Sequence, residues 1–175
     1  MGDDLRDDGQ ALRHGAPAAL WQALVREAGE RAGERLDEAR ESYLVFVLLK
    51  HQRDAQLGAR IQALDWLQAQ AEARASRADA LRDVGDRCLL IAGLYPQLAD
   101  RRRVTVDYFI ELGRGAYQGV AEAGRSATAA LFEQLAASYR ELVRVLRGMG
   151  AMPLRLDIAP MRPGAVVMPA SGARH

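Results

Sequence analysis

Apolar residues return at helical spacing through most of the first 150 residues of this chain. The pattern is clearest on one face near the end of that stretch, at Leu131, Leu135, Tyr139, Leu142 and Leu146. Such patterns predict six helices, at about residues 17–29, 36–53, 58–71, 77–93, 105–124 and 126–148. No run before residue 153 alternates with the two-residue period of a strand. The sequence therefore predicts an all-α fold, a single and largely antiparallel bundle of about six helices.

The second of these helices is predicted to be the most buried. It starts amphipathic and becomes apolar on all sides in "YLVFVLL", from Tyr43 to Leu49. The first helix is expected to begin at Pro17, which suits a first turn, and to bury a face that includes Leu20. The fifth is expected to begin after an N-cap at Thr105.

The two ends of the chain differ from the helical stretch in composition. Residues 1–15 are acidic and contain glycine, so we expect a flexible N-terminus, followed by a bundle domain over residues 16–150. Residues 151–175 form a tail with many prolines and methionines, which excludes helix over most of its length. The tail is too apolar for a typical solvated segment. We expect an extended segment that docks on its own bundle or on a second copy.

Composition limits the class of partner and the compartment of the protein, but it does not identify an activity. The chain has 24 basic and 23 acidic residues, so no global charge favours nucleic acid or an anionic membrane. Cys88 is the only cysteine, and the N-terminus is acidic where a signal peptide would be basic, which together predict a cytoplasmic protein. The longest apolar run is far shorter than the ~20 residues of a membrane span. Heavy use of alanine and arginine indicates a GC-rich, bacterial genome.

Three consecutive arginines, Arg101, Arg102 and Arg103, are the most conspicuous local charge. Between Gln97 and Arg125, however, arginines exceed acidic residues by only one. A phosphate-binding face would exclude carboxylates from its middle, and this stretch interleaves them. We therefore predict a helix junction, in which the arginines end a short helical turn that begins at Pro96. An acidic partner, protein or nucleic acid, is the alternative.

Few residues offer catalytic chemistry. No Glu-x-x-His pair exists in the chain, and its histidines stand at positions 14, 51 and 175, so we predict no metal and no cofactor. Cys88 falls on the apolar line of its helix and is predicted to be a small buried side chain. Asp79, Asp83 and Asp86 form an acidic stripe on the fourth helix. We expect Asp83 and Asp86 to pair with Arg82, Arg87 or arginines of neighbouring helices.

Three functions are consistent with these patterns. The first is a non-enzymatic cytoplasmic interaction or regulatory protein, homodimeric through its tail and through a helix face smoothed by Gly115 and Gly119. The second is a small-ligand binder or enzyme with a pocket between the second, fourth and fifth helices. Its candidate residues are Tyr43, His51, Asp83, Asp86, Arg87, Tyr108 and Glu111. The third is nucleic-acid or acidic-partner binding through Arg101–Arg103.

Overall fold

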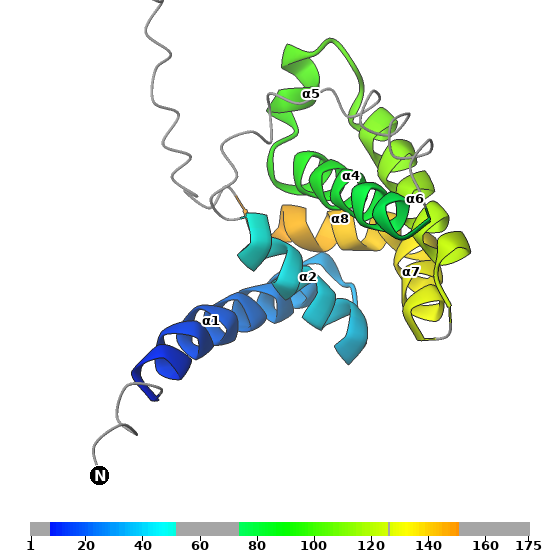
Figure 1. Ribbon diagram of the computed structural model, residues 1–175. Coiled ribbons are helices and arrows are strands. Elements are labelled where there is room, and N and C mark those ends of the chain that lie inside the picture. The colour runs from blue at the N-terminus through cyan, green and yellow to red at the C-terminus, as the bar shows by residue number, and fades with distance from the viewer. Residues whose placement is uncertain (1–7, 52–73, 126, 151–175) are drawn as a thin grey trace, which may run out of the picture.

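A computed structural model of the chain describes residues 8–51, 74–125 and 127–150 (Figure 1). These residues form seven helices and no strand, which confirms the all-α prediction. The helices are α1 (Asp8–Ala32), α2 (Glu38–His51), α4 (Arg74–Leu94), α5 (Gln97–Arg101), α6 (Val106–Ala123), α7 (Ala127–Ala137) and α8 (Tyr139–Gly148). Among them, none combines the length and the apolar character that a membrane crossing requires.

Three predicted features lie outside the described residues. They are the helix at 58–71, the first seven residues of the N-terminus and the tail over 151–175. What the sequence predicts for these segments stays a prediction.

The first helix starts earlier than predicted. α1 begins at Asp8 and carries Pro17 inside it. A proline within a helix removes one backbone hydrogen bond, and the alanines that flank Pro17 have the highest helix propensity. The buried face of α1 consists of Trp21, Val25 and Ala28, whereas Leu20 is 60% exposed, against the prediction.

The most buried helix is α4, and the prediction that the second helix holds this place is wrong. Every residue of α4 from Val84 to Gly93 is buried, whereas Phe46 on α2 is 41% exposed. The buried stretch of α4 contains Asp86, Arg87 and two glycines, which break its apolar pattern in the sequence. Hydropathy therefore understates the burial of α4.

Helices α4 and α6 pack as a close antiparallel pair. Along their contact, Leu81 meets Gly119, Gly85 meets Tyr117, and Cys88 meets Gly113. A side chain at Gly85 would overlap the ring of Tyr117, so only glycine allows this approach.

Two further helices contact α4. Helix α2 reaches it through side chains, since Tyr43 and His51 approach Asp86 and Lys50 hydrogen-bonds Asp83. Helix α8 runs in the same sense as α4, since Tyr139 reaches Gly85 and Leu146 packs on Gly93. In Figure 1, α8 lies behind α4, and α1 and α2 lie together below the pair.

The helix predicted over 126–148 is two helices, α7 and α8, that meet at Ser138. The backbone of Ser138 has φ −98° and ψ 16°, outside the helical range. Its hydroxyl donates a hydrogen bond to the carbonyl oxygen of Gln134 at 2.7 Å, an interaction that bends helices. The bend lets α7 pack on α6 while α8 reaches α1 and α4.

Candidate functional site

A fully buried carboxylate stands at the middle of α4. Asp86 has no exposed surface. One of its oxygens, Oδ1, accepts hydrogen bonds from the hydroxyls of Tyr43 at 2.7 Å and Tyr117 at 2.8 Å. Removing a charge from water is costly unless hydrogen bonds and opposite charges compensate it. A buried aspartate is therefore the most informative polar group in this fold.

Three helices position these groups. Asp86 comes from α4, Tyr43 from α2 and Tyr117 from α6. The two tyrosine rings meet edge to face, with centroids 5.8 Å apart, and both pack edge to face on Phe132 of α7. The close approach of Tyr117 to Gly85, one residue before Asp86, brings its hydroxyl within reach of the carboxylate.

The second oxygen of Asp86, Oδ2, makes no hydrogen bond within the described residues. Lys50 Nζ lies 3.6 Å from it and His51 Nε2 lies 3.7 Å from it. Lys50 also donates a hydrogen bond to Asp83 Oδ1. His51 is buried, while Lys50 and Asp83 reach the surface. We call Tyr43, Lys50, His51, Asp83, Asp86 and Tyr117 the Asp86 centre.

The Asp86 centre contains a set of metal-ligating side chains. His51, Asp83 and Asp86 can each offer one ligand atom, and these atoms all lie within 4.8 Å of one another. Two carboxylates and one imidazole are a donor set that first-row divalent metals accept. The prediction of no metal came from the spacing of histidines along the sequence. The spacing of residues along the sequence could not reveal this group of three ligands, because His51 ends α2 whereas Asp83 and Asp86 lie in the middle of α4.

The tyrosines of the centre remain protonated donors at neutral pH. Burial, and then the charge of Asp86, raises the pKa of Tyr43 and holds the pKa of Tyr117 well above its usual value. A protonated hydroxyl can donate to a carboxylate, so both tyrosines fix Oδ1 and leave Oδ2 turned toward Lys50 and His51.

Arg82 lies beside the centre, over its aromatic rings. Its guanidinium is 4.8 Å from the ring centroid of Phe46, 5.7 Å from that of Tyr43 and 5.8 Å from that of Phe132. A cation over aromatic faces is attracted by their electron density. This contact keeps Phe46 and Tyr43 of α2 in place against α4 and α7.

The structure brings four of the seven predicted pocket residues together: Tyr43, His51, Asp83 and Asp86. Arg87 is buried on the same helix as the two aspartates. Tyr108 and Glu111 are elsewhere, on the exposed face of α6. There Glu111 pairs with Arg114 at 2.6 Å and with Arg140 at 3.0 Å.

Two members of the centre were missed by sequence reasoning. Lys50 is the only lysine among 24 basic residues, and this rarity was a signal. Tyr117 follows Gly113 by four residues, so it shares the buried face of α6. For Asp83 and Asp86 the sequence predicts arginine partners; in the described residues Lys50 pairs with Asp83, the tyrosine hydroxyls donate to Asp86, and the charge of Asp86 also acts on Arg82.

The arginine triplet forms the predicted junction. α5 ends at Arg101, and Arg103 has the left-handed φ of 55°. The N–H groups of Arg103 and Val104 donate to the carbonyl oxygens of Asp100 and Ala99, as in a Schellman motif. α6 then begins after Thr105, whose hydroxyl accepts from the N–H of Tyr108, which confirms the predicted N-cap.

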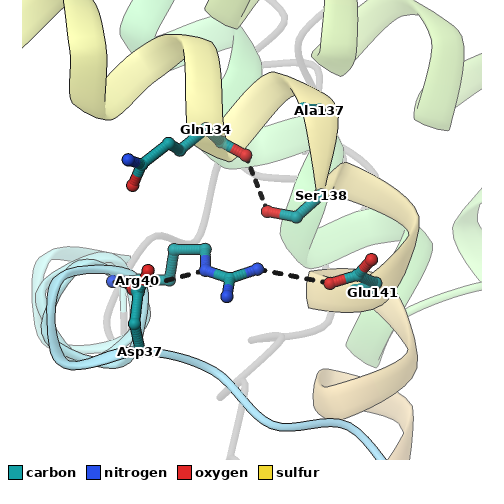
Figure 2. A pocket seen from close by; sticks show the side chains of 6 residues that line it. All are labelled: Asp37, Arg40, Gln134, Ala137, Ser138 and Glu141. Atoms are coloured by element: carbon teal, nitrogen blue, oxygen red, sulfur yellow. Dashed lines mark hydrogen bonds and ion pairs between the residues drawn. The ribbon is translucent and has the colours of Figure 1, made fainter.

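A second, more open site lies where α2 begins beside the junction of α7 and α8 (Figure 2). It is a hollow of about 360 Å³ lined by Asp37, Arg40, Gln134, Ala137, Ser138 and Glu141. The Arg40 guanidinium lies between Asp37 and Glu141, at 3.3 Å from each carboxylate. The pair with Asp37 is local to the start of α2, and the pair with Glu141 ties α2 to α8, so the charges that line the hollow already have partners.

Comparisons of the chain with protein-family models, with curated proteins and with solved structures found no match.

Proposed function

We propose that this chain is a non-enzymatic binding protein whose ligand site is the Asp86 centre, between α2, α4 and α6. One observation carries the proposal. Asp86 is completely buried, yet one of its carboxylate oxygens makes no hydrogen bond within the described residues. An oxygen in that state has the capacity to accept a bond from a ligand.

Stability alone does not account for such a centre. Replacing buried ionic groups with apolar ones of similar volume is often neutral or stabilising, so a buried charge such as Asp86 is weak evidence of a stabilising role. Convergent charged and polar side chains from different helices are typical of binding sites. Lys50 and Asp83 give the centre its access to solvent, since both are partly exposed.

Binding is favoured over catalysis by the available chemistry. Cys88, the one thiol, is fully buried at the contact between α4 and α6, where a substrate has no access. Asp86 lies 3.7 Å from His51 and is fully buried, and the Lys50 ammonium is engaged by the two carboxylates, so neither is presented to a substrate as a free nucleophile. The centre therefore supports recognition of a charged ligand.

A thermal-shift screen tests this function. The full chain is heated with divalent metal ions and with small organic cations, beside the variants Asp83→Asn and Asp79→Asn. Asp79 is exposed one turn before Asp83 on α4, so it is the matched control. We expect at least one ligand to raise the Tm of the parent and of Asp79→Asn, and to shift Asp83→Asn less. If every ligand shifts the Tm of all three proteins equally, the proposal is contradicted.

Self-association is the second candidate. Leu20 on α1 is 60% exposed and is an apolar side chain that a second copy could cover. The face predicted for this purpose, Gly115 and Gly119, offers less support, because Gly119 meets Leu81 of α4 within the same chain. Light scattering on the full chain and on a version ending at Gly150 tests it. A dimer that becomes a monomer on truncation supports tail-mediated assembly, and two monomers remove it.

A further inference from the structure

We infer that the Asp86 centre binds one divalent transition-metal ion through His51, Asp83 and Asp86, in competition with the ammonium group of Lys50. The inference rests on the proposed function and names its ligand.

The donor atoms are already grouped for this purpose. The ligand atoms of His51, Asp83 and Asp86 lie within 4.8 Å of one another. Around a tetrahedral zinc ion with bonds of 2.0–2.2 Å, neighbouring ligand atoms are about 3.3 Å apart. Side-chain rotation at partly exposed Asp83 closes much of this difference. Helices α2 and α4 need not separate or slide.

The chemistry of the donors selects the class of ion. An imidazole nitrogen with two carboxylate oxygens suits Zn²⁺, Co²⁺ and Mn²⁺, whereas Ca²⁺ and Mg²⁺ prefer oxygen alone. Three protein ligands leave a coordination position for water or a small anion.

A second observation points to an ion at this place. Asp86 is wholly buried, its Oδ1 is held by the hydroxyls of Tyr43 and Tyr117, and its Oδ2 makes no hydrogen bond within the described part of the chain. Hydrogen bonds to the other oxygen of a metal-binding carboxylate orient it and tune its affinity. The two tyrosines are therefore positioning residues, and Oδ2 is the atom they present.

Lys50 is the competing cation. Its Nζ hydrogen-bonds Asp83 and lies 3.6 Å from Asp86 Oδ2, so it stands among the same oxygens that a metal would bind. Two carboxylates and one ammonium leave a net charge of −1, whereas a divalent ion neutralises both carboxylates. The Lys50 side chain is 36% exposed, and its four-carbon stem can carry the ammonium into solvent as the ion enters.

Calorimetric titration of the full chain with ZnCl₂, repeated with CoCl₂, tests the inference. We expect one ion per chain. Losing a direct ligand in Asp83→Asn or His51→Gln should weaken binding at least about tenfold, the low end for outer hydrogen-bond partners of metal sites. Lys50→Met, which removes the competing charge, should tighten binding by about tenfold or more. Asp79→Asn should bind like the parent.

The variants are chosen to remain folded. Asp83 and Lys50 are partly exposed, so their replacement avoids the buried Asp86, and circular dichroism verifies the helices of each variant. The visible spectrum of bound Co²⁺ adds a readout of coordination that a purely structural role of Lys50 would not change.

Two results would overturn the inference. One is the absence of binding by the parent and by Lys50→Met. The other is equal affinity in the parent, Asp83→Asn and His51→Gln, which would place the ion elsewhere. If no metal binds but an organic cation stabilises the parent and not Asp83→Asn, the inference fails and the proposed function stands.

Discussion

Of two charged features of this chain, the one more conspicuous in the sequence is the less constrained in the fold. The arginine triplet, Arg101–Arg103, concentrates three positive charges within three residues, and Asp86 is a single carboxylate in an acidic stripe. In the structure, Arg101 and Arg103 are exposed at the end of α5. Asp86 is buried in α4 beneath two tyrosines.

The surroundings of a charge in the fold therefore matter more than the density of charge along the sequence. Exposed charges are solvated and screened, so their placement is weakly constrained. A buried carboxylate needs specific partners, and it persists where the fold supplies them. The Asp86 centre is therefore the better guide to function, and the comparison can be tested in four ways.

The largest effect is expected from Asp86→Ala. This change leaves the Tyr43 and Tyr117 hydroxyls without their acceptor and Lys50 without one of its two carboxylates. Breaking a buried ionic network from one side costs about 3–5 kcal/mol of unfolding free energy. Urea unfolding measures the loss. Arg101→Ala is the matched change at an exposed charge. Equal losses of unfolding free energy in the two variants would show that the buried and the exposed charge contribute equally to stability.

Alkaline pH is expected to destabilise the fold through its buried tyrosines. Burial raises the pKa of Tyr43, Tyr117 and Tyr139 in the folded state. In the unfolded chain these groups ionise near pH 10, so stability is complete below that pH and falls as the pH rises above it. Each tyrosine contributes a slope of up to about 1.4 kcal/mol per pH unit.

Urea unfolding between pH 9 and pH 11 measures this slope. Tyr117→Phe should reduce the alkaline slope by about a quarter to a third, because it removes one of three buried tyrosines, and Tyr95, whose pKa burial also raises, still contributes. An identical slope in Tyr117→Phe and the parent would show that Tyr117 ionises equally in the folded and unfolded states.

Gly85→Ala is expected to have a smaller effect on the same centre. The added methyl group would overlap the Tyr117 ring, and overpacking of this kind costs about 1–3 kcal/mol despite the better helix propensity of alanine. The cost should shrink in a Tyr117→Leu background, where the ring is gone. If the cost is the same in both backgrounds, the close approach at Gly85 does not position Tyr117.

The smallest effect, and one of opposite sign, is expected at the arginine junction. Arg103 has a φ of 55°, a conformation that glycine adopts at the end of α1, where Gly33 has a φ of 69°. Arg103→Gly should stabilise the fold by about 1 kcal/mol, because a left-handed conformation is unfavourable for other residues. Arg101→Gly, at a helical position, should destabilise it by roughly 0.5–1 kcal/mol. Destabilisation by Arg103→Gly would show that this side chain has a role beyond the junction.

Local features of the fold could be predicted from the sequence. The short helix after Pro96, the N-cap at Thr105 and the buried line from Leu135 to Leu146 all depend on neighbouring residues, and the structure confirms them. The bend at Ser138 could not be predicted, because a serine hydroxyl has several local partners and tertiary packing decides among them. The burial of α4 could not be predicted either, because buried polar residues and glycines interrupt its apolar pattern in the sequence.

The Asp86 centre was only half predictable. Tyr43, His51, Asp83 and Asp86 could be selected as polar residues on buried helices. Their proximity could not, because α2 and α4 are separated by more than twenty residues of sequence and their register sets which side chains meet. Lys50 was overlooked because a lysine at a helix end is ordinarily a solvated charge.

The most direct measurement is the anomalous diffraction of a crystal of the full chain grown or soaked with Zn²⁺. We expect one strong peak at bonding distance, about 2.0–2.2 Å, from His51, Asp83 and Asp86, with the Lys50 ammonium displaced toward solvent. A crystal in which Lys50 still occupies the centre, with zinc absent or bound elsewhere, would contradict this expectation.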